Sequence, residues 1–385
     1  MEACGAKMTS FDLVVAGAGP AGLTLAWKAA SYGLGVFLFD RKKNADHVAY
    51  TTSASFIDLK RWQLSDNIAH PISNIHLAFD GTGVDVPADA WVLNRRLLLA
   101  ELEKKCVSNG VSIAYDTSAK SVEVRNDEIG SVTLSCGRTV QGKFYADCSG
   151  LGNVFNRSLH INTTQVVQAL GHEIVVPLKA APNTVDLYIG KNIEGGYGWL
   201  FPMNGDFAIV GVGTLRKKYF RRIKDHLDAY LNSPRVASRV KNTPTESHTA
   251  VFNTGPPLRT FHRGNLILVG DVGLQGHPIA GEGIRFVMDS AEMAARSMAT
   301  AVAYQDPACL KTYSRCWTDR YYRNFSTNFK AQRFLYWLTS RKRLFDFVCR
   351  AVPGASIDTL LTLIRGEASI PFLLKKLPKV FTKKR

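Results

Sequence analysis

The stretch VVAGAGPAG, Val14 to Gly22, decides the fold of this 385-residue chain. It continues the apolar run Phe11 to Ala16, and its glycines Gly17, Gly19 and Gly22 have the spacing GxGxxG. Glycines permit a tight turn between a strand and a helix, and they let an anionic ligand approach the free N–H groups of the helix start. Taken alone, this motif indicates only a phosphate-binding turn.

A second apolar strand, Val36 to Phe39, ends at Asp40, which follows Gly22 by 18 residues. A carboxylate about 20 residues after the glycine turn can accept both hydroxyls of an adenosine ribose. The alternative is a glycine-rich turn with a surface aspartate, but strand, glycines, helix, strand and acid occur in the order of a dinucleotide site. The contacts predicted for this half are Gly17, Gly19, Pro20, Ala21, Gly22, Asp40 and Arg41.

A second glycine-rich stretch, LVGDVGLQGHPIAGEGI, extends from Leu268 to Ile284. Asn265 to Gly270 predicts a short strand, and a helix is expected from about Arg285 to Thr300. The start of that helix, aimed at a flavin ring, would stabilise negative charge on the reduced ring. Two such units predict FAD rather than NAD, with further contacts at Gly270, Asp271, Gly281, Glu282, Gly283 and Ile284.

With these motifs the chain resembles the geranylgeranyl reductase family of FAD-dependent oxidoreductases, which is related to the aromatic hydroxylase flavoproteins. The resemblance covers roughly residues 10–300, and its most specific part is YGWLFP at Tyr197 to Pro202, similar to the family's YxWxFP. It also rests on Arg95 in NRRLLLAEL and Asp147 in ADCSG. It implies that Asp147 contacts FAD, and that Arg95 and Asp271 contact its phosphates and ribitol.

The same resemblance implies an activity, namely saturation of carbon–carbon double bonds in isoprenoid (geranylgeranyl-type) chains on a lipid or quinone. Two departures from the family affect individual residues. Thr51 and Thr52 stand where many members have a Cys-Gly pair, so the family's cysteine-dependent movement is not carried over. Cys148 replaces the glycine that usually follows the aspartate of the Asp147 segment.

Alternation along YGWLFP places Tyr197, Trp199 and Phe201 on one face of a strand. With Pro202 they are predicted to form a wall of the substrate pocket, the alternative being ordinary core packing. Tyr197 and His277 are the candidate catalytic residues, as sources of the proton that alkene reduction requires. A structural role is the alternative for a histidine in a glycine-rich turn.

The predicted fold class is α/β plus α+β, with a Rossmann-like FAD-binding domain, a discontinuous antiparallel-sheet substrate domain and a helical C-terminal region. Residues 164–214 read as successive strands without helices, which indicates the antiparallel sheet. The FAD-binding domain is assigned to residues 9–47, 95–160 and 258–310. The substrate domain takes residues 60–94 and 161–257, and residues 311–385 form the basic C-terminal region.

The net charge of +16 is concentrated at the C-terminus, where residues 311–385 hold 17 Lys or Arg against 4 Asp or Glu. Aromatic residues alternate with these cations, and the tail reads IPFLLKKLPKVFTKKR. This mixture predicts peripheral contact with an anionic membrane. A solvated helical cap is one alternative. Nucleic acid is not expected as a partner, because no reader motif accompanies the charge.

The seven cysteines are scattered and form no CxxC pair, which indicates reduced thiols and no metal site. Met1 to Ser10 contains no apolar core of a signal peptide, and no apolar run approaches 18 residues. We therefore expect a cytoplasmic protein, peripheral at the inner face of the cell membrane.

Two other activities remain open. One is a flavin-dependent monooxygenase or halogenase, since halogenases carry a WxWxIP segment; the lysine they need has only Lys60 as a candidate. The other is a carotenoid cyclase-like flavoenzyme, which uses reduced flavin without net electron transfer. Because no second nucleotide fold is evident, the electron donor is expected to be NAD(P)H or a small redox protein.

Overall fold

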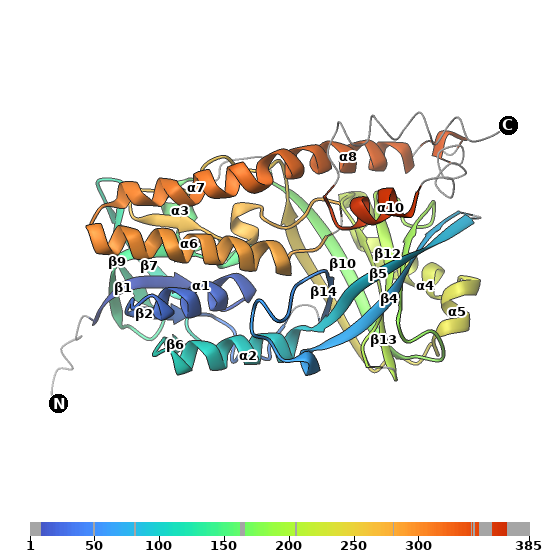
Figure 1. Ribbon diagram of the computed structural model, residues 1–385, viewed down its shortest axis with the longest axis horizontal. Coiled ribbons are helices and arrows are strands. Elements are labelled where there is room, and N and C mark those ends of the chain that lie inside the picture. Colours follow the sequence, from blue (N-terminus) through green and yellow to red (C-terminus); the bar gives the residue numbers. More distant parts are fainter. Residues whose placement is uncertain are drawn as a thin grey trace.

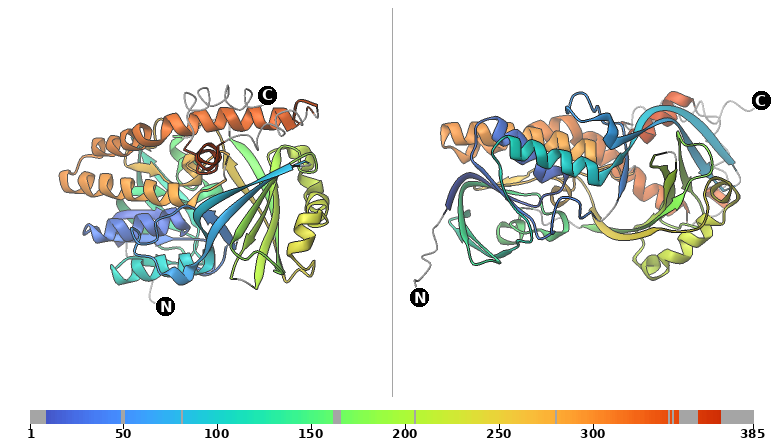
Figure 2. Two further views of the ribbon diagram at one scale, coloured as in Figure 1. Left: turned by 45° about the vertical axis from the view of Figure 1, so that its right-hand side comes forward. Right: turned by 90° about the horizontal axis from the view of Figure 1, so that it is seen from below.

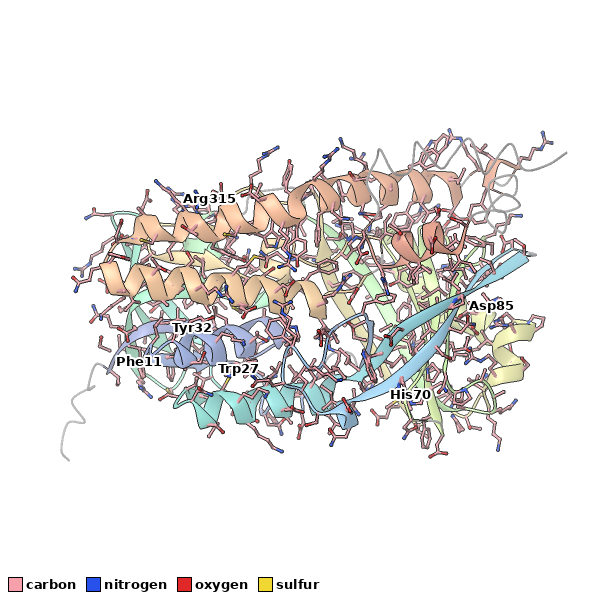
Figure 3. The ribbon with its side chains drawn as sticks, in the orientation of Figure 1. Phe11, Trp27, Tyr32, His70, Asp85 and Arg315 are labelled. Atoms are coloured by element: carbon pink, nitrogen blue, oxygen red, sulfur yellow. The ribbon has the colours of Figure 1, made fainter. Side chains whose placement is uncertain are left out.

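The computed structural model describes residues 9–48, 51–80, 82–161, 166–204, 206–279, 281–339, 341, 343–345 and 356–367. Two eight-stranded sheets lie toward opposite ends of an elongated molecule, and long helices lie along its upper side in Figure 1. Phe11 marks the first sheet, whereas His70 and Asp85 lie on the long ribbon at the far end (Figure 3).

The first sheet has a parallel centre flanked by short antiparallel pieces. Its order is β15-β16-β9-β1-β2-β6, and a β7–β8 hairpin joins the edge of β9. The strands are β1 (Thr9–Ala16), β2 (Val36–Phe39), β6 (Ser112–Ala114), β7 (Ala119–Arg125), β8 (Glu128–Leu134), β9 (Thr139–Asp147), β15 (His262–Arg263) and β16 (Leu266–Leu268). All four residues of β2 are buried, as expected for a strand covered on both faces.

Three helices cover one face of this sheet. They are α1 (Pro20–Ser31), α2 (Arg95–Ser108) and α6 (Ile284–Tyr304), with α1 in contact with the other two. Pro20 occupies the first turn of α1, where its missing N–H has no consequence. The Asn94 side chain caps α2 by accepting the N–H groups of Arg96 and Leu97 at 3.0 and 3.2 Å.

The second sheet has the order β14-β10-β13-β12-β11-β4-β5-β3. All its pairs are antiparallel except β4 with β11. The strands are β3 (Thr52–Ser55), β4 (Ala69–Phe79), β5 (Thr82–Asn94), β10 (Val167–Pro177), β11 (Thr184–Ile189), β12 (Gly196–Pro202), β13 (Phe207–Thr214) and β14 (Glu246–Thr254).

The two faces of the second sheet have different neighbours. Leu200, Val210 and Val212 point to one face and pack against α4 (Ile223–Leu231), which lies with α5 (Pro234–Arg239) on the outside of the molecule (Figure 2). The opposite face turns toward α8 (Arg323–Thr339) and α10 (Ile357–Ile364). This face is the one that bears the cavity described below.

The remaining elements are short. They are the helix α3 (Asn156–Leu159) and the 3₁₀ turns Asp66–Ile68, Gly150–Gly152, Lys217–Arg222, Asp271–Gly273 and Pro307–Leu310.

A helical arm follows α6. α7 (Lys311–Trp317), a π-helical turn (Thr318–Tyr322) and α8 succeed one another and run from the first sheet to the second (Figure 1). Tyr313 and Trp317 are fully buried on the inner side, whereas Arg315 points outward (Figure 3). The predicted basic tail at 370–385 lies outside the described residues. Within the described part of the chain, no helix is both long and apolar enough to span a bilayer.

The predicted fold class is confirmed, with some local differences. The helix expected from about Arg285 to Thr300 is observed at Ile284–Tyr304. β3 was not expected, because TSAS lacks apolar alternation. The parallel pairing of β4 with β11 also departs from a purely antiparallel sheet, since these strands are separated by part of the first sheet and no tight turn fixes their direction.

Candidate active site

One continuous cavity of about 710 Å³ extends from the glycine turn of the first sheet to the open face of the second. At the end near the first sheet it collects residues from three distant segments of the chain. Those that were predicted to bind the cofactor and that line it are Gly17, Gly19, Pro20, Ala21, Asp40, Arg95, Gly270, Asp271, Gly281, Glu282, Gly283 and Ile284.

The three glycines of the first turn have different environments. Gly17 has φ +104°, and a Cβ there would lie 2.5 Å from the Cys148 carbonyl oxygen. A Cβ at Gly22 would collide with the Gly17 carbonyl, so Gly22 serves the packing of strand and helix rather than the cavity. A Cβ at Gly19 would meet nothing within 4 Å. The open side of the turn therefore faces the space available to a ligand.

The cradle fits a dinucleotide because two helices begin at its wall. Gly19 precedes α1 and Gly283 precedes α6, and neither helix has a side-chain cap. A Cβ at Gly283, as at Gly19, would meet nothing within 4 Å. Two helix starts with free N–H groups suit a pyrophosphate at one and an electron-rich ring edge at the other. The residues present thus fit FAD.

Asp40 ends β2 at the wall of the cavity. One carboxylate oxygen accepts the Ala18 N–H at 2.6 Å and the other accepts the Lys42 N–H at 2.9 Å. The Lys42 ammonium group in turn donates to the Ala18 carbonyl at 2.8 Å. These bonds fix the carboxylate beside the glycine turn, and its contact with a ribose remains a prediction.

Arg95 is the first residue of α2, and its N–H donates to the Thr51 carbonyl at 2.9 Å. Burial raises the pKa of both Asp271 and Glu173, and the positive charge of Arg95 opposes that shift in each. Arg95 is therefore close enough to act electrostatically on one carboxyl from each sheet.

The Gly270-Asp271 turn is held from behind by the C-terminal arm. Gly270, at φ +86°, donates its N–H to Gln275 Oε1 at 2.7 Å. The Gln275 amide donates to the Tyr313 hydroxyl at 2.6 Å, and Tyr313 donates to the Leu268 carbonyl at 3.1 Å. This buried chain of hydrogen bonds fixes the shape of the turn.

Glu282 joins the two sheets at the start of α6. Its Oε1 accepts the Ser55 hydroxyl at 2.5 Å and the Phe56 N–H at 3.3 Å, while Oε2 accepts Arg285 at 3.3 Å. Burial raises the pKa of Glu282, and Arg285 and Ser55 oppose that rise. Its carboxyl is thus tied to the protein's own groups at both oxygens.

Four residues predicted for the site do not line the cavity: Gly22, Arg41, Asp147 and Pro202. Arg41 is exposed, and Pro202 is paired with Ala208 at the end of β12. The Asp147 carboxylate is fully buried and accepts the Ser149 N–H and hydroxyl and the N–H groups of Phe155 and Asn156, at 2.6 to 3.1 Å. Its role in the structure is to shape the following loop, because both oxygens are occupied.

The two candidate proton sources both lie at the cavity. His277 is 2% exposed, its ring stacks on Phe286 at 5.5 Å, and burial lowers its pKa to about 3. It is therefore neutral at physiological pH. Burial raises the pKa of Tyr197 to about 12, so its phenol keeps its proton.

The other half of the cavity is apolar. Tyr197, Trp199 and Phe201 follow one another on its wall, with ring centroids 5.6 and 6.1 Å apart, whereas Leu200 packs on the opposite face. The predicted alternation is observed. A Cβ at Gly211 would collide with the Trp199 indole, so glycine lets the ring lie flat on β13. The other walls are Ile72, Ile75, Leu77, Val185, Leu187, Ile189, Leu335, Leu338, Leu360 and Ile364.

Several lining residues were not predicted: Thr52, Ser53, Ala54, Ser55, Phe56, Ser149, Gly150, Glu173, Gln332 and Tyr336. Glu173 stands out only as an acid beside His172 in the otherwise apolar segment ALGHEIVVP, and this pattern does not tell which face of the sheet it lies on. The polar residues of β3 carry no such pattern. Among the described residues, no group of three or more His, Cys, Asp or Glu is arranged to hold a metal ion.

The sequence matches a known family over most of its length. The family model described as "Lycopene cyclase protein" matches residues 12–345. The chain belongs to this family.

Individual flavoproteins are similar to the chain at low sequence identity but over most of its length. The chain is 24% identical to a digeranylgeranylglycerophospholipid reductase of Methanococcus vannielii, over 96% of each chain. A geranylgeranyl bacteriochlorophyll reductase-like protein from Thermoplasma acidophilum has a TM-score of 0.80 at 20% identity, over 98% of each chain. The flavin-dependent brominase Bmp2 has a TM-score of 0.73 at 18% identity, over 98% of this chain and 100% of its own.

These comparisons confirm the predicted relationship to geranylgeranyl reductases and to the broader flavoprotein group. They also support the predictions of an FAD cofactor and of an oxidoreductase. The cradle between the two helix starts is therefore the candidate flavin site of this chain.

Proposed function

We propose that the protein is an FAD-dependent reductase that saturates carbon–carbon double bonds of isoprenoid (geranylgeranyl-type) chains on a lipid or quinone. The observation that supports this most is the continuity of the cavity. Its glycine-lined end suits a dinucleotide, and its other end is walled by aromatic and aliphatic side chains. A long apolar chain in that chamber would lie directly beside the bound cofactor.

FAD, when bound and reduced, supplies hydride to a carbon of the double bond. The chain's own residues bind and orient. The starts of α1 and α6 and the Arg95 guanidinium hold the anionic parts of the cofactor. Trp199 and Phe201 form a flat apolar wall for the alkene and exclude water from it. The two predicted proton sources, Tyr197 and His277, are both uncharged at the cavity, because burial raises the pKa of Tyr197 to about 12 and lowers that of His277 to about 3. Neither pKa is close to neutral pH, where a general acid is most effective.

We also propose that the protein touches an anionic membrane surface through the outer side of α8, on the cytoplasmic face. Phe334 and Trp337 are 59% and 43% exposed there, and their rings stack at 5.6 Å. The Arg341 guanidinium lies 4.0 Å above Trp337. Ala331, Leu335 and Leu338, on the inner side of the same helix, line the cavity. A lipid leaving the membrane at α8 would have a short path inward.

The electron donor is proposed to be NAD(P)H or a small redox protein. The described residues form no second nucleotide-binding sheet beside the first. The donor would therefore reach the flavin from outside, by transient docking.

The decisive experiment is anaerobic incubation of the dithionite-reduced protein, loaded with FAD, with vesicles of a digeranylgeranyl phospholipid. Reductase activity adds two hydrogens to the lipid for each double bond and leaves oxidised flavin. Lipid of unchanged mass and structure, with the flavin still reduced, would contradict the proposal.

A cyclase is the second candidate, because the matching family model is described by that activity. The same assay separates it, since a cyclised product has the mass of its substrate. The halogenase alternative receives less support: Lys60 is exposed, and no lysine among the described residues lines the cavity.

A further inference from the structure

The second sheet places one carboxyl beside its aromatic wall. Trp199 of β12 pairs with Gly211 of β13, and Gly211 pairs with Glu173 of β10. Residues directly opposite each other in antiparallel strands point to the same face of a sheet. Glu173 is therefore on the cavity face, one strand beyond the glycine over which the Trp199 indole lies.

Glu173 is 2% exposed, and only one of its oxygens is satisfied by the protein. Oε1 accepts the Thr51 N–H at 3.1 Å and the Thr51 hydroxyl at 3.4 Å. From the described residues no hydrogen bond reaches Oε2. Glu282, the other buried glutamate of the cavity, is engaged at both oxygens. The second oxygen of Glu173 is not enclosed by protein atoms but opens to the cavity, where a substrate can reach it.

The surroundings of Glu173 favour its neutral, proton-bearing form. Burial is the largest influence and raises its pKa, while the Thr51 N–H, Arg95 of α2, His248 of β14 and the Thr51 hydroxyl oppose the rise. A general acid must carry its proton at the working pH. The rings of Trp199 and Tyr197 lie on the same face, and aromatic faces stabilise positive charge that develops on a carbon receiving a proton.

We propose that Glu173 is the acid that protonates the substrate double bond, an inference that rests on the proposed reductase function. The O–H bond of Glu173 breaks as a C–H bond forms at one alkene carbon, and the neighbouring carbon receives the hydride supplied by reduced FAD. The alkene is thereby reduced by two electrons and FAD is oxidised. The Glu173 carboxylate then regains a proton from solvent.

The test is single-turnover alkene reduction by the FAD-loaded protein, reduced with dithionite and mixed anaerobically with vesicles of a digeranylgeranyl phospholipid. Glu173→Gln removes the acid at constant shape, and we expect reduction at least about 100-fold slower. Flavin content and thermal midpoint should match wild type. Glu128→Gln, an isosteric change at an exposed position of the first sheet, serves as the control with an unchanged rate.

A Glu173→Gln protein that reduces the lipid within threefold of the wild-type rate overturns the inference. If that variant fails to fold or to hold FAD, Glu173→Asp decides, because it keeps the acid on a shorter side chain. We expect slower turnover and a displaced alkaline limb of its pH profile. A wild-type rate and profile in that variant also overturns the inference. Failure of the proposed function is distinct, because wild-type protein would then hold reduced FAD and leave the lipid unchanged.

Discussion

The phenol of Tyr197 abuts Gly281, so that a Cβ added at Gly281 would lie 2.5 Å from Tyr197 Oη. Tyr197 belongs to β12 of the second sheet, and Gly281 belongs to the turn that precedes α6. The aromatic wall and the turn at the cofactor end are thus in direct contact. We therefore expect a substitution in the aromatic wall to affect the turn before α6, and a substitution in that turn to affect the wall.

Gly281→Ala should weaken FAD binding by at least about tenfold, because the new methyl group meets the phenol and an alanine at φ +64° costs about 1–2 kcal/mol. Flavin titration followed by fluorescence quenching measures the affinity. Tyr197→Phe removes the oxygen involved, so the double variant should recover part of the loss. Additive effects of the two substitutions would contradict direct contact.

Arg95→Ala should lower FAD affinity by about 10- to 100-fold, because a charge-assisted contact to a phosphate contributes roughly 1.5–3 kcal/mol. The neighbouring Arg96→Ala is the matched control, since Arg96 is on the surface and pairs with Glu246 at 3.0 Å. Isothermal titration with FAD compares the two. Equal losses in both variants would mean that Arg95 acts only through net charge.

Gly211→Ala should destabilise the protein by about 1–3 kcal/mol, because a methyl group there collides with the Trp199 indole. The displaced ring would enter the chamber and weaken binding of an apolar ligand. Gly213→Ala provides the comparison, since its Cβ would lie 3.3 Å from the same ring and needs only a small adjustment. Urea unfolding and titration with a prenyl lipid measure the two effects. Equal destabilisation would exclude the Trp199 explanation.

The buried, neutral His277 should make stability depend on pH. Its pKa is about 3 in the folded protein and about 6.5 when unfolded, so between these values the unfolded chain binds the extra proton. The contribution of neutral His277 to the free energy of unfolding is fully present above about pH 6.5. It falls by about 1.4 kcal/mol per pH unit as the pH decreases toward 3. His277→Gln lacks this dependence. The stability gap between wild type and variant should narrow by about 2 kcal/mol from pH 7 to 5 in urea unfolding. A difference in stability between wild type and variant that does not change with pH would contradict the neutral state of His277 in the folded protein.

Replacing both Phe334 and Trp337 by alanine should reduce partition onto anionic vesicles by at least about tenfold, because each aromatic ring transfers apolar area into the headgroup layer. Tyr304→Ala is the control: Tyr304 is 76% exposed at the end of α6, away from the proposed surface. Cosedimentation with vesicles measures the partition. Unchanged binding to the vesicles would contradict membrane contact through the outer side of α8.

The sequence predicts those parts of the fold that depend on patterns of a few neighbouring residues. The glycine spacing at Gly17 to Gly22 needs only a few consecutive residues to be recognised, and the turn that it predicts is observed. The alternation of Tyr197, Trp199 and Phe201 is likewise local. Asp147 shows where such local patterns fail to predict a role. An aspartate after a buried strand has the same sequence pattern whether it faces a ligand or binds the loop that follows.

Glu173 could not be assigned to the cavity from the sequence for a different reason. Its position depends on the β12–β13 hairpin and on the pairing of β10 with β13, which joins residues far apart in the chain. The strand β3 was missed because its four residues, TSAS, are small and mostly polar. Their place in the cavity wall comes from pairing with β5, which no short pattern reveals.

The hydrogen bonds that link Gly270, Gln275 and Tyr313 determine how far the polypeptide can be shortened. Tyr313 lies beyond the glycine-rich segments, yet its hydroxyl supports the turn that closes the nucleotide cradle. A protein ending at residue 310 would lose that support together with the buried Trp317, and its flavin would dissociate. Deletions intended to remove the basic, apolar end for handling in solution should therefore start only downstream of Glu367, because Leu360 and Ile364 of α10 line the cavity and Glu367 pairs with Arg285.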